Sequence, residues 1–234
     1  MFRFRDRREA GQKLAELLVP YAVEHPVILA LPRGGVPVAY EVAKVLGARL
    51  DIWVVRKIGV PWHPELGVGA VAEGGFVHLN HDVLQNVGLA DSEIEAAIEN
   101  QRREVEARVM RFRDGHPAPT LKDRTVIVVD DGIATGGTVR AAIRSIRAQG
   151  PKQVILAVPV VAAATAKTLQ PEVDRLVYLR APHELYAIGL WYDDFSQVPD
   201  EVVVGMLERA HTEQASSSRD GVHRPLTAPG RVAP

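Results

Sequence analysis

The sequence predicts an α/β fold, an open and mainly parallel sheet flanked by helices. Short runs of aliphatic, largely β-branched residues such as Val126–Val129 and Val154–Val158 have the composition of strands that are buried on both faces. Segments with apolar residues at helical spacing alternate with these runs, as in parallel sheets whose strands are connected by helices. Glycine-rich turns follow two of the strands, which places permissive backbone at the carboxyl edge of the sheet.

The first half of the chain begins with a helix that Asp6 caps and that runs to about Tyr21, with Leu14, Leu17 and Leu18 on its apolar face. Strands are expected after it at Val27–Leu31, Ile52–Val55 and Phe76–Leu79. A helix is expected at Val36–Leu46, a short helix from a cap at Asn80 to Val87, and a long helix from a cap at Asp91 to about Phe112. Residues 58–75 hold seven glycines and prolines, which argues for a long loop between two strands.

The second half repeats the alternation of strands and helices. Strands are expected at Val126–Val129, Val154–Val158 and Arg175–Leu179, and helices at Val139–Ala148, Ala162–Leu169 and from a cap at Asp200 to about Ala210. From His211 the chain turns to Ser, Pro, Gly and Arg with few apolar residues, so residues 211–234 are expected to be a disordered tail after a single domain at 1–210.

Composition narrows the class of protein. The 234 residues are 47% hydrophobic, enough to fill one core, and the net charge of −1 argues against nucleic acid or an anionic membrane as a partner. The absence of cysteine excludes disulfides and thiolate metal sites. No apolar segment has the pattern of a signal peptide or the length of a membrane span, so a cytoplasmic location is expected.

Residues Thr125–Thr138 read TVIVVDDGIATGGT, a buried strand followed by two aspartates and a loop of glycines and threonines. Two adjacent glycines let the backbone approach a phosphate closely, and the helix that follows offers free N–H groups. The two threonines can donate hydrogen bonds from their hydroxyls. Asp130 and Asp131 can accept hydrogen bonds from vicinal hydroxyls, which a phosphate cannot offer. The loop therefore suits a phosphorylated sugar.

Two other interpretations fit this loop less well. Gly132 and Gly137 have the spacing of a nucleotide-binding Walker A loop, but Thr138 stands where that loop requires lysine. Two carboxylates ahead of the loop would also repel a polyphosphate unless a metal intervened. A plain glycine-rich turn between strand and helix would need neither the aspartate pair nor the threonine spacing.

A second strand, turn and helix surround Pro32-Arg33-Gly34-Gly35. An arginine among glycines at the end of a strand is placed to bind an anion, with backbone N–H groups beside it. Arg56 and Lys57 follow the strand expected at Ile52–Val55, where they could neutralise pyrophosphate or simply form a solvated strand end.

Thr125–Thr138 resembles the signature of type I phosphoribosyltransferases, enzymes of phosphoribosyl pyrophosphate (PRPP): an apolar strand, two acidic residues and T-G-x-T. The resemblance implies that family's fold, with a small hood and a mobile loop at residues 58–75, and a cis peptide bond is a candidate at Pro32-Arg33. It implies that Arg33, Lys57, Asp130 and Asp131 are catalytic. The implied PRPP-binding residues are Arg33, Gly34, Gly35, Arg56, Lys57, Asp130, Asp131, Gly132, Ile133, Ala134, Thr135, Gly136, Gly137 and Thr138.

The segment from Ala181 to Phe195 resembles the hood of hypoxanthine-type members of this family. On that pattern Tyr186 stacks on the base, the backbone of Ala187 contacts it, and Mg²⁺ lies near Asp131 and Asp193 together with substrate phosphate oxygens. Core packing is the preferred interpretation of the other aromatic residues, Trp191, Tyr192 and Phe195.

The implied function is Mg²⁺-dependent transfer of the phosphoribosyl group from PRPP to a nitrogenous base, with release of pyrophosphate. A homodimer is one possible assembly, and the oligomeric state stays open. Ala134 stands where hypoxanthine-type enzymes carry an aspartate base, so the acid or base stays open, with Glu65 and Glu73 of the loop as candidates. Two alternatives remain. One is a regulator that senses PRPP without turnover and binds RNA, and the other is hydrolysis or transfer on another phosphosugar.

Overall fold

A computed structural model describes residues 2–60 and 63–220, apart from the side chains of residues 63–66, 81 and 215–220. Its main sheet has the order β2-β1-β6-β7-β8, and all of its strands are parallel. The strands are β1 (Val27–Ala30), β2 (Arg49–Ile52), β6 (Thr125–Val129), β7 (Gln153–Val160) and β8 (Arg175–Arg180). The predicted open parallel sheet is therefore confirmed.

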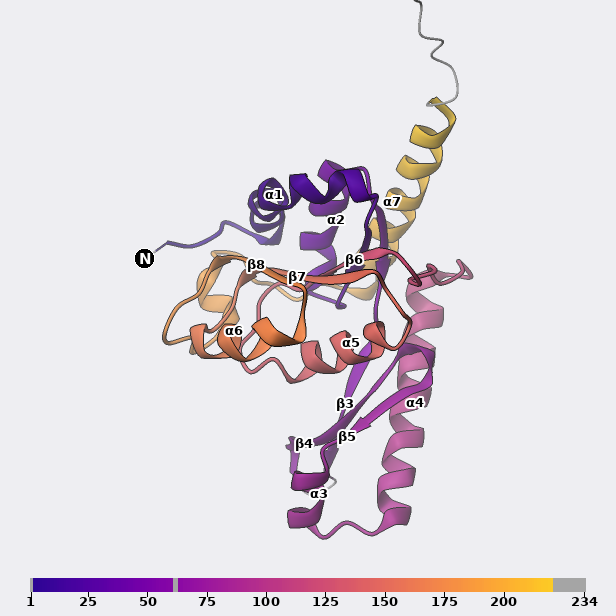
Figure 1. Ribbon diagram of the computed structural model, residues 1–234, viewed down its shortest axis with the longest axis vertical. Helices are drawn as coiled ribbons and strands as arrows, with labels where there is room; N and C mark the ends of the chain where they lie inside the picture. Colours follow the sequence, from indigo (N-terminus) through magenta and orange to yellow (C-terminus); the bar gives the residue numbers. More distant parts are fainter. Residues whose placement is uncertain (1, 61–62, 221–234) are drawn as a thin grey trace, which may run out of the picture.

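Helices cover both faces of the main sheet, as Figure 1 shows. They are α1 (Arg7–Leu18), α2 (Gly35–Leu46), α5 (Gly137–Arg147), α6 (Ala163–Leu169) and α7 (Asp200–Asp220). The described chain also contains the 3-10 helices η1 (Val19–Glu24), η2 (Glu73–Gly75), η3 (Gln170–Glu172) and η4 (Ile188–Trp191). Alternate residues of β1 serve the two sides: Ile28 and Ala30 pack with α1, α2 and α7, whereas Val27 and Leu29 pack with α5 and α6. A strand that is apolar on both faces is explained by this double cover.

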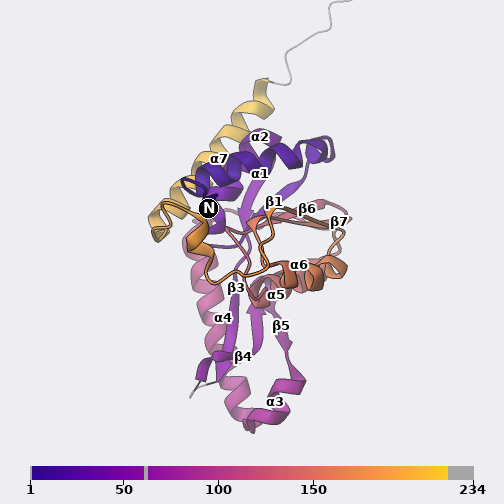
Figure 2. The ribbon, with the colours of Figure 1, turned by 90° about the vertical axis from the view of Figure 1, so that its left-hand side faces the viewer.

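The segment between β2 and β6 forms a second unit that projects from the main sheet (Figures 1 and 2). It contains an antiparallel sheet of β3 (Val55–Val60), β4 (His63–Ala72) and β5 (Phe76–Leu79), followed by α3 (His81–Val87) and α4 (Asp91–Arg113). The loop predicted at residues 58–75 is thus largely strand, because β4 pairs with β3 from Val55–Ala72 to Val60–His63. His63, predicted to lie in a loop, begins β4.

The glycines of this unit are explained by close packing between strands and not by a mobile loop. A Cβ atom at Gly69 would lie 2.4 Å from the carbonyl oxygen of His78 on β5, and one at Gly67 would lie 2.9 Å from the Lys57 side chain. Both glycines therefore let neighbouring chain segments approach closely within a strand. Composition alone had suggested a loop because glycine serves both purposes.

The third strand differs from its prediction. The run Ile52–Val55 crosses a junction, since β2 ends at Ile52 and β3 begins at Val55 in a different sheet. At the junction the Trp53 backbone N–H still donates to the Ala30 carbonyl at 2.9 Å, and its indole N–H donates to Ser145 Oγ at 2.8 Å. The residues on both sides of the break are buried and apolar, so hydrophobicity could not mark it. Arg56 and Lys57 consequently lie within β3 and do not end a strand of the main sheet.

The helix ends agree with the expected caps in part. The Asp6 carboxylate accepts a hydrogen bond from the Glu9 N–H at 2.7 Å and caps α1 as predicted, but α1 ends at Leu18 and Leu17 is exposed. Asn80 caps α3 as predicted, whereas the cap of α4 is Ala90 and Asp91 is its first residue. Helix α7 continues to Asp220, so the part of the expected tail at residues 211–220 is helical, and residues 221–234 lie outside the described chain.

None of the helices in the described part of the chain has both the length and the hydrophobicity needed to cross a membrane.

Candidate functional site

The loops that follow β1 and β6 meet at one edge of the main sheet. The two strands are neighbours, and the chain leaves them in opposite directions, toward β2 and toward β7. In open parallel sheets ligands bind outside the carboxyl ends of the strands at such a reversal. The loops are in contact here, since a Cβ atom at Gly34 would lie 2.0 Å from Asp131 Oδ2 and one at Gly35 would lie 2.7 Å from the Val129 carbonyl oxygen. The structure thus brings the two glycine-rich motifs together.

The loop after β6 is held at its base and open at its tip. Ile133 is buried, its N–H donates to the Val160 carbonyl and its carbonyl accepts from the Ala162 N–H. The Thr165 hydroxyl donates to the Ala134 carbonyl at 2.5 Å. Gly136 has a φ of +79°, which favours glycine, and α5 begins directly after it. The loop therefore presents the exposed N-terminus of a helix at a defined place.

This loop encloses a cavity of about 250 Å³. Ile188 of the hood closes one side of it, and a Cβ atom at Gly132 would lie 2.5 Å from the Ile188 side chain. Its lining is Asp130, Asp131, Gly132, Ile133, Ala134, Thr135, Gly136, Gly137, Thr138, Val139 and Ile188. All of the predicted residues of the loop line one cavity, whereas Ile188 was not predicted to do so.

The Asp131 carboxylate is held from several sides. Its Oδ2 accepts a hydrogen bond from Arg7 Nε at 2.8 Å, and both side chains are 12% exposed. The Tyr192 hydroxyl donates to the Asp131 carbonyl at 2.6 Å, and the Asp131 N–H donates to Asp130 Oδ1 at 2.9 Å. Burial raises the pKa of Asp131 while the Arg7 guanidinium lowers it, and burial together with the charge of Asp131 raises the pKa of Asp130 well above its usual range.

The loop after β1 carries positive charge toward α4 and α7. The Pro32–Arg33 peptide bond is cis, as predicted. Arg33 Nη1 lies 3.4 Å from Asp200 Oδ1 at the start of α7. Burial lowers the pKa of Arg108 on α4, and the guanidinium groups of Arg56 and Arg33 lower it further, so three arginines from three elements gather here. The Nε atom of Arg56 is buried without a hydrogen-bond partner among the described residues.

Lys57 faces a different region from Arg56, its neighbour on β3. Lys57 lines a cavity of about 270 Å³ between the antiparallel sheet and α5, which Gly137 and Thr138 also line. In the sequence both cations were candidates to neutralise pyrophosphate, with a solvated strand end as the alternative. The alternation of side chains along a strand separates them, with Lys57 on the side of α5 and Arg56 among the arginines near α4.

The hood segment divides into a buried part and an exposed part. Trp191 and Tyr192 are buried and Phe195 packs against the same cluster, which confirms the core interpretation of these aromatic residues. Tyr186, the predicted base-stacking residue, is 82% exposed, and its hydroxyl donates to Glu184 at 2.7 Å. An exposed ring followed by Ala187 is available to a flat ligand at this edge.

The predicted metal ligands differ in what surrounds them. The Asp193 side chain is 63% exposed, with Arg3 at 3.9 Å, whereas Asp131 is already paired with Arg7. In the described part of the chain no group of three or more His, Asp or Glu side chains could hold a metal ion by itself. This donor set fits Mg²⁺ that arrives with substrate phosphates, since that ion usually takes one or two carboxylates and keeps several waters.

Glu73 is not available as an acid or base. Its carboxylate is buried and accepts a short hydrogen bond from Arg113, which also donates to Asp51 Oδ1 at 2.7 Å and to the Ile52 carbonyl at 3.0 Å. Burial raises the pKa of Glu73, against the effect of Arg113. The residue joins η2 to α4 and β2, and this buried ion pair argues against Glu73 as the acid or base. The side chain of Glu65, the other candidate, lies outside what the structure describes.

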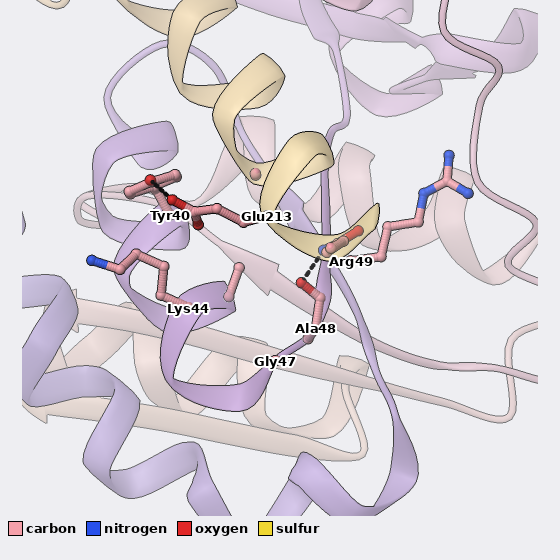
Figure 3. A pocket seen from close by; sticks show the side chains of 9 residues that line it. Tyr40, Lys44, Gly47, Ala48, Arg49 and Glu213 are labelled. Atoms are coloured by element: carbon pink, nitrogen blue, oxygen red, sulfur yellow. Dashed lines mark hydrogen bonds between the residues drawn. The ribbon is translucent and has the colours of Figure 1, made fainter. Parts of the chain in front are cut away.

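A cavity of about 460 Å³ lies at the opposite edge of the main sheet, between α2 and α7 (Figure 3). Tyr40 and Glu213 point toward each other there, and the Tyr40 hydroxyl donates to Glu213 Oε1 at 3.0 Å. The cavity adjoins Arg49, where β2 begins. Because ligands of parallel sheets bind at the carboxyl ends of the strands, the candidate site is assigned to the loops after β1 and β6.

Comparison with known proteins agrees with this geometry. The model of the phosphoribosyl transferase domain matches residues 7–179, and the chain belongs to that family. Two curated relatives, from Mycobacterium tuberculosis strains CDC 1551 and H37Rv, are 43% identical over 214 residues, and their own naming as phosphoribosyl transferases is provisional. That match covers 92% of this chain and 48% of each relative, so the chain spans about half their length.

A solved structure gives the same picture. The protein TT1426 from Thermus thermophilus is 43% identical and superposes with a TM-score of 0.78, over 89% of this chain and 99% of that one. The structural match therefore agrees with the family match.

Proposed function

We propose that this protein transfers the phosphoribosyl group of PRPP to a nitrogenous base and releases pyrophosphate, a reaction of nucleotide metabolism. The observation that carries the proposal is the contact between the two loops. It sets an aspartate pair for a sugar diol and a helix N-terminus for a phosphate beside the Pro32–Gly35 turn.

In this proposal each end of PRPP has its own residues. Asp130 and Asp131 accept hydrogen bonds from the ribose hydroxyls, and the loop from Ala134 to Thr138 binds the 5-phosphate. Arg33 and Arg56 stabilise the leaving pyrophosphate as a nitrogen atom of the base displaces it from the anomeric carbon. The transition state resembles a ribosyl oxocarbenium ion, so holding the ribose, neutralising the leaving group and excluding water are what lower the barrier.

Two further roles follow from the exposed part of the hood. The ring of Tyr186 stacks on the acceptor base and the Ala187 backbone contacts it. Asp193 is the carboxylate open to Mg²⁺, which would add positive charge at the pyrophosphate oxygens.

Calorimetry with PRPP, with and without Mg²⁺, tests the binding, and a panel of bases tests turnover through pyrophosphate release. Heat of binding that depends on Mg²⁺, followed by release with at least one base, is the expected result. A folded protein that gives no heat at millimolar PRPP would contradict the proposal. Binding of PRPP without release across the panel would support a sensing role instead.

Replacing Arg33 by alanine should weaken the binding of PRPP and of pyrophosphate by about tenfold, a loss typical of one charged hydrogen bond, and leave ribose 5-phosphate nearly unaffected. The reason is that Arg33 belongs to the turn after β1 and the phosphate loop follows β6. Titration of the three ligands measures the difference. Arg111→Ala is the matched control, because Arg111 pairs with the same Asp200 carboxylate but is 55% exposed on α4. An equal loss for all ligands would refute the assignment of Arg33 to the pyrophosphate end.

Rates of amide hydrogen exchange should differ between the regularly paired part of β3 and β4 and the irregular end of the same two strands. The ladder amides of Val55–Ile58 and Gly69–Ala72 are expected to exchange slowly without ligand, because they lie in regularly paired strands. The register of the β3–β4 pair shifts on both sides of Gly59. Amides at Gly59–Val60 and His63–Gly67 are therefore expected to exchange more slowly when PRPP is bound. Amides of β6 serve as the slow reference. Fast exchange along the whole ladder in the free protein would show that the unit is a mobile loop after all.

A further inference from the structure

Arg7, the first residue of α1, reaches from the N-terminal helix into the candidate site. Its Nε donates to Asp131 Oδ2 at 2.8 Å and its Nη1 donates to the Ser196 carbonyl at 2.9 Å. Its guanidinium carbon lies 3.9 Å from the centre of the Phe195 ring. One side chain therefore connects three segments that are far apart in the sequence: α1, the loop after β6 and the hood.

These contacts confine the Asp131 carboxylate. The Gly34 backbone lies on one side of Oδ2, so close that a Cβ atom there would be 2.0 Å away, and Arg7 occupies another. The Tyr192 hydroxyl holds the Asp131 carbonyl. Removing Arg7 would leave a largely buried carboxylate beside Asp130 without its positive partner, and a buried charge that loses its partner is strongly destabilised.

We propose that Arg7 is a positioning residue for ribose binding, which fixes the orientation of Asp131 and makes the N-terminal helix part of the PRPP site. The inference rests on the proposed function, since it takes the ribose diol as the ligand of the aspartate pair. Arg7 acts through Asp131 and needs no contact with the ligand. The affinity for a ligand that lacks ribose, such as pyrophosphate, should therefore not depend on Arg7.

The test compares Arg7→Met, Arg7→Lys and Arg8→Met by calorimetry with PRPP, ribose 5-phosphate and pyrophosphate in the presence of Mg²⁺. Arg7→Met should lose about tenfold or more in affinity for the two ribose ligands, as for one partner of a buried charge pair, and keep its affinity for pyrophosphate. Arg7→Lys keeps the charge but not the planar fork, so it should recover part of the loss. Arg8 is the matched control, because it is the next residue of α1, is 66% exposed and pairs with Glu41.

Each outcome decides the inference. Unchanged ribose affinity in Arg7→Met, or an equal loss for pyrophosphate, would overturn it, since the second pattern indicates general damage to the fold. If circular dichroism shows that Arg7→Met does not fold, Arg7→Lys decides alone: a smaller loss restricted to the ribose ligands supports the inference and a uniform loss overturns it. A folded wild-type protein that binds none of the three ligands contradicts the proposed function itself, whereas wild-type binding with an unaffected Arg7→Met contradicts only the role of Arg7.

Discussion

Replacing Asp130 and Asp131 together by asparagine is expected to weaken PRPP binding by about tenfold or more, because a charged hydrogen bond to a ribose hydroxyl contributes roughly 1.5–3 kcal/mol. The fold should survive, since both side chains belong to a loop at the edge of the sheet and not to its apolar core. Calorimetry measures the affinity and circular dichroism the fold. A folded double variant with wild-type affinity would contradict the assignment of the aspartate pair to the ribose.

The two single substitutions, Asp130→Asn and Asp131→Asn, should have different effects on the free energy of unfolding. Burial and the charge of Asp131 raise the pKa of Asp130, so the folded protein binds a proton there more readily than the unfolded chain does. Stability from this group is complete at acid pH and is lost as the pH rises through the raised pKa. Asp130→Asn should therefore be as stable as the wild type at pH 7, or more stable by about 0.5–2 kcal/mol. Asp131→Asn should be less stable, because the 12%-exposed Arg7 loses its charged partner. Urea unfolding at pH 7 distinguishes the two variants, and the opposite order would contradict this account.

Replacing Arg113 by methionine is expected to lower the free energy of unfolding by about 3–5 kcal/mol, the loss seen when one partner of a buried ion pair is removed. Arg113 is 5% exposed and pairs with both Asp51 and Glu73, whose side chains are 1% and 10% exposed. The variant would leave two buried carboxylates without their cation, at the point where α4, β2 and η2 join the projecting unit to the main sheet.

Urea unfolding measures this effect, and Arg111→Ala on the same helix is its control. Arg111 is 55% exposed and pairs with Asp200 and Glu201, so its loss should cost less than about 1 kcal/mol. Similar values for both variants would show that the buried cluster around Arg113 contributes no more than a surface ion pair.

Strands β1 and β6 were predictable because a strand covered on both faces is apolar at nearly every position, as in the run Val126–Val129. The same reasoning failed where β2 passes into β3. Ile52 and Val54 are both buried, so the apolar run continues through a change of sheet that only the backbone pairing defines. Strand β4 was missed for a related reason, because Gly67 and Gly69 permit close strand packing and resemble loop residues in composition.

The candidate site divides in the same way. The loop from Asp130 to Thr138 was recognisable because its chemistry is contiguous in the chain and needs one short turn to assemble. Arg7, Arg108 and Ile188 could not be found, since each belongs to a distant segment and has no local pattern that sets it apart. Glu73 is the opposite case, because the sequence suggested a role for it in the site, whereas its carboxylate forms an ion pair with the buried Arg113.

Local sequence patterns were enough to predict the parallel α/β class and the position of the candidate loop, because hydrophobic periodicity and short-range turn chemistry act over a few neighbouring residues. The packing of distant segments, by contrast, places Arg56 and Lys57 in different regions and pairs Arg7 with Asp131. The physical reason is that an ion pair across 124 positions depends on where α1 packs against the sheet, and packing is the sum of many apolar contacts that no single residue encodes.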